Sequence, residues 1–318
     1  MTTSTSVLSA LRGRAEAAAH PAATPCGCGA ATLADRPDGV VVRHGATVAK
    51  AHGPGTDPAA LDRRLAVAAH PALTGVLLPP LRPTAEPLDG RLVTFWPYGT
   101  PVDPDRPERA PWEAAGSLLA RLHSVPAHRL PPGLPAMRGP LKAAAALARM
   151  RASDPGHPAV PPILAAWRTL PPWARAEAPY AHARALCHGD LHLGQLVRRP
   201  DDPAAWLLID IDDLGLGDPA WDLARPAAWF ACGLLPAEDW TRFLTAYQRA
   251  GGARELTRAD PWPALDVPAR ALTAQTAALA VAKAADAGRA LDEVEEAVVD
   301  ACARMASVPT RWGDDQAK

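Results

Sequence analysis

The chain has 318 residues, of which 33 are basic and 34 acidic, so its formal net charge at pH 7 is −1. A charge this close to zero argues against a strongly basic nucleic-acid-binding protein. Since 48% of the residues are hydrophobic, the chain is not disordered throughout, and its length suits one large unit or two lobes. The longest apolar segment, around residues 226–237, is shorter than the roughly 18 uncharged apolar residues that a membrane-spanning helix needs, so we expect no membrane partner.

The five cysteines predict a reducing, cytoplasmic compartment, because their number is odd, their positions are scattered and no secretory apolar segment precedes them. They are Cys26, Cys28, Cys187, Cys232 and Cys302. Cys26 and Cys28 could hold a metal ion, but no second Cys or His pair lies at zinc-finger spacing from them. We therefore expect an exposed pair without a function.

The chain begins without a clear pattern and continues with a strand pair. Residues 1–30 run through Ser, Thr, Ala, Pro and Gly without a persistent apolar period, which predicts a loosely ordered tail or a short helix. Residues 40–42 and 47–50 predict two strands joined by a turn that contains Gly45. We expect a hairpin there.

A helix and a third strand complete a small N-terminal lobe. Residues 57–69 carry apolar side chains at helical spacing, and the segment starts with Asp57 as a cap and Pro58 in the first turn. Residues 91–96 predict another strand, which a Pro-Tyr-Gly sequence ends. Residues 31–100 are therefore expected to form a lobe of strands with one helix.

The remaining residues, 101–318, predict a larger and mostly helical lobe. The patterns at 112–123 and 141–150 are typical of helices, and segments rich in Ala and Leu continue to residue 306. One stretch, 186–222, is dense in polar residues and contains two short apolar runs. We expect these runs to form a small hairpin embedded in the helical lobe.

Two acids and a carboxamide meet at this predicted hairpin. The tripeptide His188-Gly189-Asp190 comes before it, Gln195 follows five residues after Asp190, and Asp210 closes the second apolar run. Phosphoryl transfer needs such a set: an acid near the attacking hydroxyl, oxygen ligands for Mg²⁺ and a cation for the nucleotide phosphates.

The two sequence blocks around the hairpin resemble a known family. They are HGDLHLGQ at 188–195 and LLIDIDDLGLGDPAWDLA at 207–224. Their spacing resembles the aminoglycoside phosphotransferase and choline-kinase-like family of small-molecule kinases, over about residues 35–230. The resemblance implies an α+β, bilobal protein-kinase-like fold, with a small strand-rich N-lobe that binds the nucleotide and a larger, mostly helical C-lobe that carries the catalytic hairpin and the acceptor site.

The resemblance also implies a function and its residues. The protein would use ATP and Mg²⁺ to move the γ-phosphoryl group to a hydroxyl of a small molecule. Asp190 would be the catalytic base, Gln195 and Asp210 would bind Mg²⁺, and Lys50 would contact the nucleotide phosphates. Asp62, on the helix after the lysine strand, is the nearest acid able to pair with Lys50.

Four more residues complete the implied site. The segment RLVTFWPYG, with Phe95 and Tyr98, occupies the place where adenine meets backbone groups. Pro97 has no N–H to donate, so the adenine contacts are shifted by a residue or a different nucleotide is used. His188 and Asp222 would support the catalytic loop, with the acceptor as a second possible contact of Asp222.

Two features depart from the usual family pattern: one concerns the metal ligand and the other the substrate. The family usually has Asn where this chain has Gln195, which keeps the carboxamide oxygen on an arm longer by one methylene. Sugar-kinase relatives such as maltokinases share the HGDxHLGQ form, which favours sugars. Taken singly, Lys50 could be a solvated charge and Asp190 a turn residue; the joint pattern favours a nucleotide site.

The acceptor and one alternative function stay open. The region after the hairpin mixes acidic and basic residues, which suits a neutral sugar or amino sugar at least as well as a polycationic aminoglycoside. Aromatic residues there could stack on sugar rings but are more often core; they are Trp221, Trp229, Tyr247 and Trp262.

The alternative function is a peptide Ser/Thr kinase, or a catalytically weak nucleotide-binding subunit of a biosynthetic assembly with a protein partner. No Ser, Thr or Tyr lies between Asp210 and Asp222, so no phosphorylation site exists there, which argues for the small molecule.

Overall fold

A computed structural model describes residues 2–20, 26–36, 38–180 and 185–307. The chain divides into two compact units, each built from three separate segments. Unit 1 comprises Met1–Ala110, His128–Pro135 and Leu193–Asp212, and unit 2 comprises Pro111–Ala127, Ala136–His192 and Asp213–Lys318. The division in chain order into a tail (1–30), an N-lobe (31–100) and a C-lobe (101–318) therefore differs from these units, because unit 1 also includes residues 1–30, 101–110, His128–Pro135 and Leu193–Asp212.

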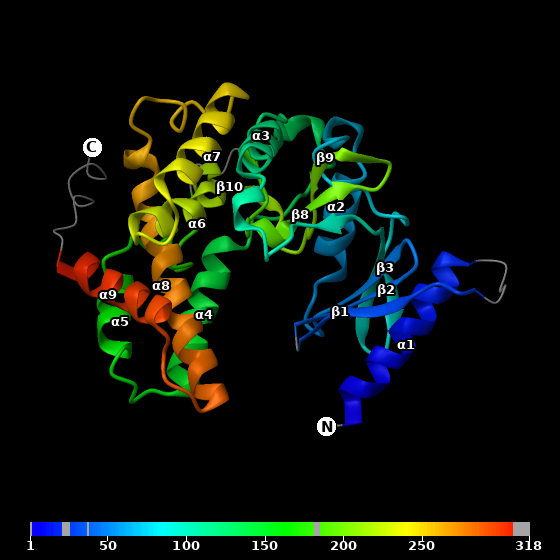
Figure 1. The fold of residues 1–318 in the computed structure, drawn as a ribbon, viewed down its shortest axis with the longest axis horizontal. Coiled ribbons are helices and arrows are strands. Elements are labelled where there is room, and N and C mark those ends of the chain that lie inside the picture. The colour runs from blue at the N-terminus through cyan, green and yellow to red at the C-terminus, as the bar shows by residue number, and fades with distance from the viewer. Residues whose placement is uncertain (1, 21–25, 37, 181–184, 308–318) are drawn as a thin grey trace. The chain divides into compact units, whose positions relative to one another are not determined.

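Unit 1 is built on an antiparallel sheet of five strands in the order β1-β2-β3-β5-β4 (Figure 1). The strands are β1 (Ala30–Arg36), β2 (Gly39–His44), β3 (Thr47–His52), β4 (Glu86–Leu88) and β5 (Arg91–Pro97). The predicted hairpin is confirmed: β2 pairs with β3, and Gly45 turns the chain with a φ of 56°, in the left-handed region that favours glycine.

One face of this sheet is covered by α1 (Thr2–Ala19), which packs on β2 and β3 (Figure 1). Val7, Leu11 and Ala15 are spaced four residues apart, so they share one face of the helix, and all three are buried. They pack against alternate residues of β2, β3 and β5. These are Val40, Val42, Ala49, Ala51, Val93 and Phe95. The expected loose tail or short helix is thus an 18-residue helix; its apolar stripe is too sparse to recognise among alanines.

The helix predicted over residues 57–69 is α2 (Pro58–Ala68). Asp57 caps it, because its side chain accepts a hydrogen bond of 3.0 Å from the Ala59 backbone N–H, and Pro58 occupies the first turn, where a missing N–H costs nothing. Leu61 and Leu65 are fully buried. The local sequence therefore fixes both where this helix starts and which side it buries.

The hairpin between the two motif blocks also belongs to unit 1. Its strands are β8 (Leu196–Arg199) and β9 (Asp202–Leu208), and β8 pairs with the short β6 (Thr100–Pro101). Leu208 exchanges backbone hydrogen bonds with Val76 and Leu78, each 2.9 Å long. These pairings to early parts of the chain place the hairpin in the strand-rich unit, whereas we expected it within the helical lobe.

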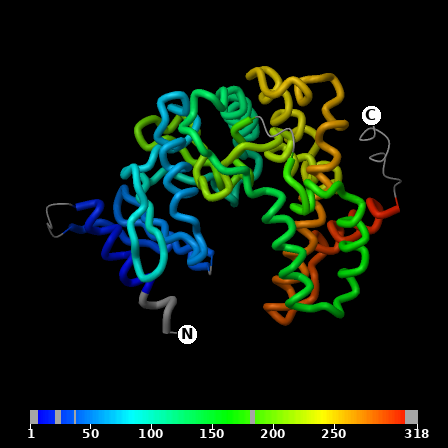
Figure 2. The backbone as a smooth tube through the Cα atoms, turned by 180° about the vertical axis from the view of Figure 1, so that it is seen from behind, coloured from blue at the N-terminus to red at the C-terminus, as the bar shows by residue number. Residues whose placement is uncertain are grey.

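Unit 2 is mostly helical. It contains α3 (Trp112–His123), α4 (Gly139–Ser153), α5 (Val160–Arg168), α6 (Pro219–Ala231), α7 (Ala237–Arg249), α8 (Trp262–Ala287) and α9 (Glu293–Ser307), with a strand pair β7 (Ala185–Cys187) and β10 (Gly215–Gly217). The long α8 packs on α4 and α6, and α4 and α8 lie side by side in Figures 1 and 2. Among the described helices, none is both long and apolar enough to span a membrane.

Helices α3 and α7 approach closely at Gly116. A Cβ atom added there would collide with the backbone oxygen of Phe243 and lie 3.0 Å from the backbone nitrogen of Tyr247. A hydrogen atom is the only side chain that this distance admits. The helix predicted at 112–123 is confirmed in its bounds, and the glycine explains how near its partner can come.

Candidate active site

The predicted site residues fall into two groups, one in each unit. In unit 1, Lys50 of β3 meets the acids that follow β9. Lys50 Nζ lies 2.7 Å from Asp210 Oδ1 and 3.0 Å from Asp212 Oδ2, and its side chain is only 15% exposed. Asp212 also contacts His52, at 3.0 Å between Oδ1 and Nδ1. The motif block thus brings two carboxylates to the strand lysine 160 residues earlier.

The backbone at Asp210 has an unusual conformation for its residue type. Its φ is 65°, in the left-handed region that non-glycine residues rarely adopt. The Asp210 side chain accepts a hydrogen bond of 3.2 Å from the Asp212 backbone N–H, which closes a tight turn just after the strand. Such a turn aims the carboxylate back toward Lys50, and conformations of this kind concentrate at functional sites.

The charges of this group support one another. Burial alone would lower the pKa of Lys50, but Asp210 and Asp212 raise it above its ordinary value. Burial would likewise raise the pKa of both acids, but Lys50 holds the pKa of Asp210 below its usual range and that of Asp212 well below it. At neutral pH the cluster therefore holds one cation and two anions, a net negative charge that suits a further cation.

The oxygen donors here fit Mg²⁺. Gln195, which is buried, directs its side-chain nitrogen to Asp210 Oδ2 at 3.4 Å, and a half-turn of the amide would present its oxygen instead. Carboxylate and carboxamide oxygens are hard ligands of the kind that Mg²⁺ prefers. Gln195 and Asp210, the two predicted ligands, thus lie together, and Asp212 adds a third possible oxygen donor.

The expected pair of Lys50 with Asp62 is absent from the described contacts of both residues. Asp62 lies on the exposed side of α2 and accepts a hydrogen bond of 3.4 Å from the Ala85 backbone N–H. The helix buries Leu61 and Leu65, so the position after Leu61 points away from the core. The acids that pair with Lys50 come instead from the motif block.

Of the two predicted nucleotide contacts of the connector, Phe95 has its side chain on the face of the sheet opposite to Lys50. Phe95 is paired with Ala49 on β3, whereas Lys50 is paired with Thr94, so Phe95 and Lys50 lie on opposite faces of the sheet. The Phe95 ring is 1% exposed in the α1-covered core. Tyr98 donates its backbone N–H to the Ala46 carbonyl at 2.7 Å, so that N–H already has a partner in this structure. Its ring lies under the Arg43 guanidinium, 3.5 Å from the ring centre.

In unit 2, Asp190 lies between two cations. Its Oδ2 is 2.7 Å from Lys142 Nζ of α4, and its Oδ1 is 2.6 Å from Arg225 Nη2 of α6. Lys142 also contacts Asp213 Oδ2 at 2.8 Å, so this lysine bridges the two acids. The Asp190 side chain is 17% exposed.

These cations keep Asp190 ionised. Burial alone would raise its pKa, but Lys142 and Arg225 lower the pKa below its usual value. Burial also lowers the pKa of neighbouring His192 to about 4, so that imidazole is neutral at pH 7. The carboxylate is thus available as a hydrogen-bond acceptor over the whole neutral range.

Asp222 holds the loop that carries Asp190. Its two carboxylate oxygens accept backbone N–H groups from His188 at 2.6 Å and from Gly189 at 2.7 Å, and its Oδ2 also contacts His123 Nε2 at 3.0 Å. Gly189 has a φ of 85°, and an added Cβ would collide with the Asp213 backbone. The tripeptide therefore needs its glycine, and Asp222, which is 1% exposed, fixes the tripeptide from within the core.

Sequence reasoning missed Lys142, Arg225, Asp212 and His123. Asp212 lies inside the recognised block and could have been found there. Lys142 offered a weaker signal: it is one of only four lysines among 33 basic residues, so a lysine in place of an arginine is uncommon in this chain. His123 ends a helix whose pattern says nothing of its contact with Asp222.

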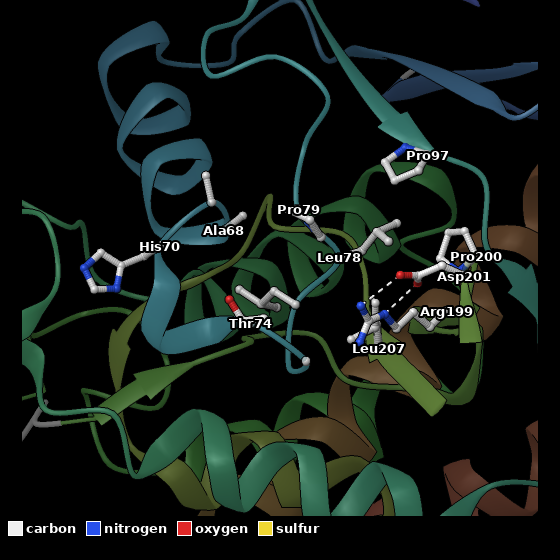
Figure 3. A pocket seen from close by; sticks show the side chains of 13 residues that line it. Ala68, His70, Thr74, Leu78, Pro79, Pro97, Arg199, Pro200, Asp201 and Leu207 are labelled. Carbon is white, nitrogen blue, oxygen red and sulfur yellow. Dashed lines mark hydrogen bonds and ion pairs between the residues drawn. The ribbon is translucent and has the colours of Figure 1, made fainter. Parts of the chain in front are cut away.

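A cavity of about 290 Å³ lies elsewhere in unit 1 (Figure 3). It is lined by the end of α2, the segment 74–79 and the β8–β9 hairpin, where Arg199 pairs with Asp201. None of Lys50, Gln195 and Asp210 lines it. It is therefore separate from the group around Lys50.

Most of the chain matches a known protein family. A family model described as the phosphotransferase enzyme family matches residues 39–262. Comparison with curated proteins gave no match.

Three solved structures show the likeness in fold. A choline/ethanolamine kinase family protein from Mesorhizobium loti is 17% identical, with a TM-score of 0.54 over 92% of this chain and 95% of that chain. The aminoglycoside phosphotransferase APH(3'')-Id from Streptomyces rimosus is 21% identical, with a TM-score of 0.53 over 82% of this chain and 97% of that chain. The macrolide 2'-phosphotransferase MphH from Brachybacterium faecium is 19% identical, with a TM-score of 0.50 over 94% and 99%. The predicted α+β kinase-like fold is confirmed.

Proposed function

Because the chain belongs to the phosphotransferase enzyme family, as the motif blocks predicted, we propose that it uses ATP and Mg²⁺ to phosphorylate a hydroxyl group of a small molecule. The acceptor class is a sugar, an amino sugar or an aminoglycoside-like compound. We assign nucleotide binding to the strand-rich N-terminal region, 31–100, together with the hairpin of unit 1, and acceptor binding to the helical region after it. The alternative of a peptide kinase or a weakly catalytic subunit becomes an outcome of the test below.

The observation that carries this proposal is the contact of Lys50 with Asp210. It joins the strand lysine to the acid of the motif block within one unit, at 2.7 Å. An ammonium group has three hydrogens, and the two carboxylates engage two of them, which leaves one for a phosphate oxygen. Bound Mg²⁺, held by Gln195 and Asp210, would supply positive charge to the phosphates.

Asp190 takes the role of base in this proposal. Its carboxylate accepts a hydrogen bond from the acceptor hydroxyl and orients the oxygen toward the γ-phosphorus. As the new P–O bond forms and the bond to ADP breaks, the hydroxyl proton passes to Asp190. Lys142 and Arg225 hold this carboxylate ionised, so it can orient the hydroxyl throughout the reaction. It takes the proton late, because the hydroxyl becomes acidic only as its oxygen bonds to phosphorus.

The test is ADP release by the purified protein with Mg·ATP over a panel of acceptors. The panel contains aminoglycosides, macrolides, glucosamine, neutral sugars, choline, homoserine and a Ser/Thr peptide. We expect release that depends on one small-molecule class, and a loss of about 10²- to 10⁴-fold in Asp190→Asn with the nucleotide-induced thermal shift retained. Asp300→Asn, which changes an exposed acid of α9, is the matched control.

Three outcomes would overturn the proposal. Full acceptor-dependent release by Asp190→Asn would remove Asp190 from the reaction. A nucleotide-induced thermal shift without ADP release on any acceptor would favour the weakly catalytic subunit. ADP release with the peptide alone would favour the peptide kinase.

A further inference from the structure

Four side chains of metal-binding type converge beside the C-terminal end of α1. They are His20, Cys26, Cys28 and His44, and their sulfur and nitrogen atoms all lie within 4.8 Å of one another. Cys26 Sγ is 3.1 Å from His44 Nε2, and Cys28 Sγ is 3.3 Å from His20 Nε2. The two imidazole rings meet edge to face, with 5.3 Å between their centres. Their contacts with one another do not involve Lys50 or its carboxylate partners.

The fold explains why they meet. His20 directly follows α1, and His44 ends β2 on the sheet face that α1 covers, because it shares that face with Val40 and Val42. The cysteines precede β1, whose first residue, Ala30, is paired with His44. Three elements thus deliver ligands to one point, which explains why no short spacing in the sequence revealed them.

The surrounding backbone leaves room for the thiols. The Gly45 N–H donates to the Gly29 carbonyl at 3.1 Å, which ties the cysteine segment to the β2–β3 turn. A Cβ added at Gly45 would lie 3.3 Å from Cys28 Sγ, a tight contact. The turn glycine is therefore required both for its φ of 56° and for the space beside the sulfur.

The distances suit a tetrahedral ion. With bonds of about 2.3 Å to sulfur and about 2.05 Å to nitrogen, a tetrahedral zinc ion separates a sulfur from a nitrogen by about 3.6 Å. The two short contacts, 3.1 and 3.3 Å, lie near this value. Because no two of the four atoms are more than 4.8 Å apart, binding needs a contraction of at most about 1.5 Å along any edge. Two thiolates and two imidazoles form a donor set typical of structural zinc.

We propose that His20, Cys26, Cys28 and His44 form a structural Zn²⁺ site that fastens α1 and the start of β1 to the β2–β3 turn. All four positions of the tetrahedron are filled by protein, so the site has no open position for substrate. Metal binding releases the thiol protons and replaces the hydrogen bonds between thiols and imidazoles with bonds to the ion. The site stabilises the helix that covers the sheet carrying Lys50. The expectation that Cys26 and Cys28 are an exposed pair without a function is replaced by this assignment.

The first experiment measures metal in full-length, tag-free protein purified under reducing conditions. We expect about one zinc ion per chain in wild type. Cys28→Ser removes an exposed ligand, so folding should tolerate this change. His20→Gln removes a second, half-buried ligand. Each should weaken zinc binding by more than the roughly 10- to 100-fold that loss of an outer-shell partner causes. Cys232→Ser, which changes a half-buried thiol of unit 2, should keep the full content.

The second experiment does not depend on which metal the protein carries after purification. Wild-type protein stripped by a chelator is titrated with Co²⁺, which should give the thiolate-to-cobalt absorption of a tetrahedral site, and Zn²⁺ should displace it. The chelator should lower the Tm of wild type and of Cys232→Ser but leave that of Cys28→Ser unchanged. Failure of reduced, folded protein to take up either ion, or a disulfide between Cys26 and Cys28 in freshly isolated protein, would overturn the proposal.

Discussion

At the scale of single residues, the most informative finding is that Asp190 has two basic neighbours. A carboxylate intended as a strong base would be expected among apolar groups, which raise its pKa. Here Lys142 and Arg225 lower the pKa of Asp190, so the residue is suited to orienting a hydroxyl more than to removing its proton early. Lys142 has a second partner in Asp213 and therefore also holds two neighbouring acids together.

The contribution of Lys142 can be tested by Lys142→Met. We expect a loss of about 1–3 kcal/mol in the free energy of unfolding at pH 7, a range reduced for the 34% exposure of the lysine. Without the lysine the pKa of Asp190 rises. Because the folded-state pKa of Asp190 in wild type lies below its unfolded value, its stabilising effect is present above that value and is lost as pH falls.

As pH is lowered from 7 toward 4, Asp190 therefore protonates earlier in the variant than in wild type, and the deficit of the variant should shrink in that range. Urea denaturation at pH 7 and at pH 4.5 measures both values. Lys283→Met, at an exposed lysine of α8, should change little at either pH. A deficit equal at the two pH values would show that Lys142 acts through packing of its methylene chain and not through its charge.

At the scale of helices and strands, local sequence signals were sufficient to predict single elements, but they could not predict which distant elements pair. The β2–β3 hairpin, the capped α2 and the bounds of α3 followed from turn glycines, an Asp-Pro start and apolar spacing. The same signals could not show that β9 pairs with the segment at Val76, since that contact joins residues far apart in the chain. The motif block identified Asp190, Gln195 and Asp210, whereas Lys142 had no motif of its own.

The face of an element was a further limit of sequence reasoning. Phe95 was expected near the nucleotide because it lies in the connector, but strand pairing assigns it to the opposite face from Lys50. Asp62 was expected beside Lys50 because it follows in sequence, but α2 turns it outward. In both cases the direction of the side chain depended on a register that only the folded sheet and helix define.

Two glycine substitutions should have opposite effects on helix packing. Gly116→Ala in α3 introduces a Cβ against the backbone of α7, and we expect a loss of about 1–3 kcal/mol in the free energy of unfolding. Gly13→Ala in α1 meets nothing within 4 Å and removes a flexible residue from a helix, so we expect a gain of about 0.4–1 kcal/mol. Chemical denaturation measures both, and a gain in Gly116→Ala would contradict the close approach of α3 and α7.

At the scale of the whole molecule, ligand binding should be visible as stability. A ligand at 100 times its Kd adds about 2.7 kcal/mol to the folded state, and about 1 kcal/mol corresponds to about 1.5 °C in a chain of 318 residues. We therefore expect saturating Mg·ATP to raise the Tm by about 4 °C.

The Mg²⁺-dependent part of this shift should disappear in Asp210→Asn, because that change removes a charged metal ligand and a partner of Lys50. The comparison uses the shift and not the absolute Tm, since loss of the ion pair also changes the unliganded protein. Asp201→Asn, at an exposed acid of the same hairpin, should keep the shift. An equal shift in both variants with Mg·ATP would remove Asp210 from the metal site.

The course of the chain has a consequence for engineering. The boundary between the units falls between His192 and Leu193 and again between Asp212 and Asp213, so the motif blocks are divided between the units. A fragment cut after residue 110 would carry Lys50 without either of its carboxylate partners. A graft that transplants the strand-rich unit between relatives must therefore include Leu193–Asp212 as a second cassette, and recombination at a single crossover would separate the lysine from its acids.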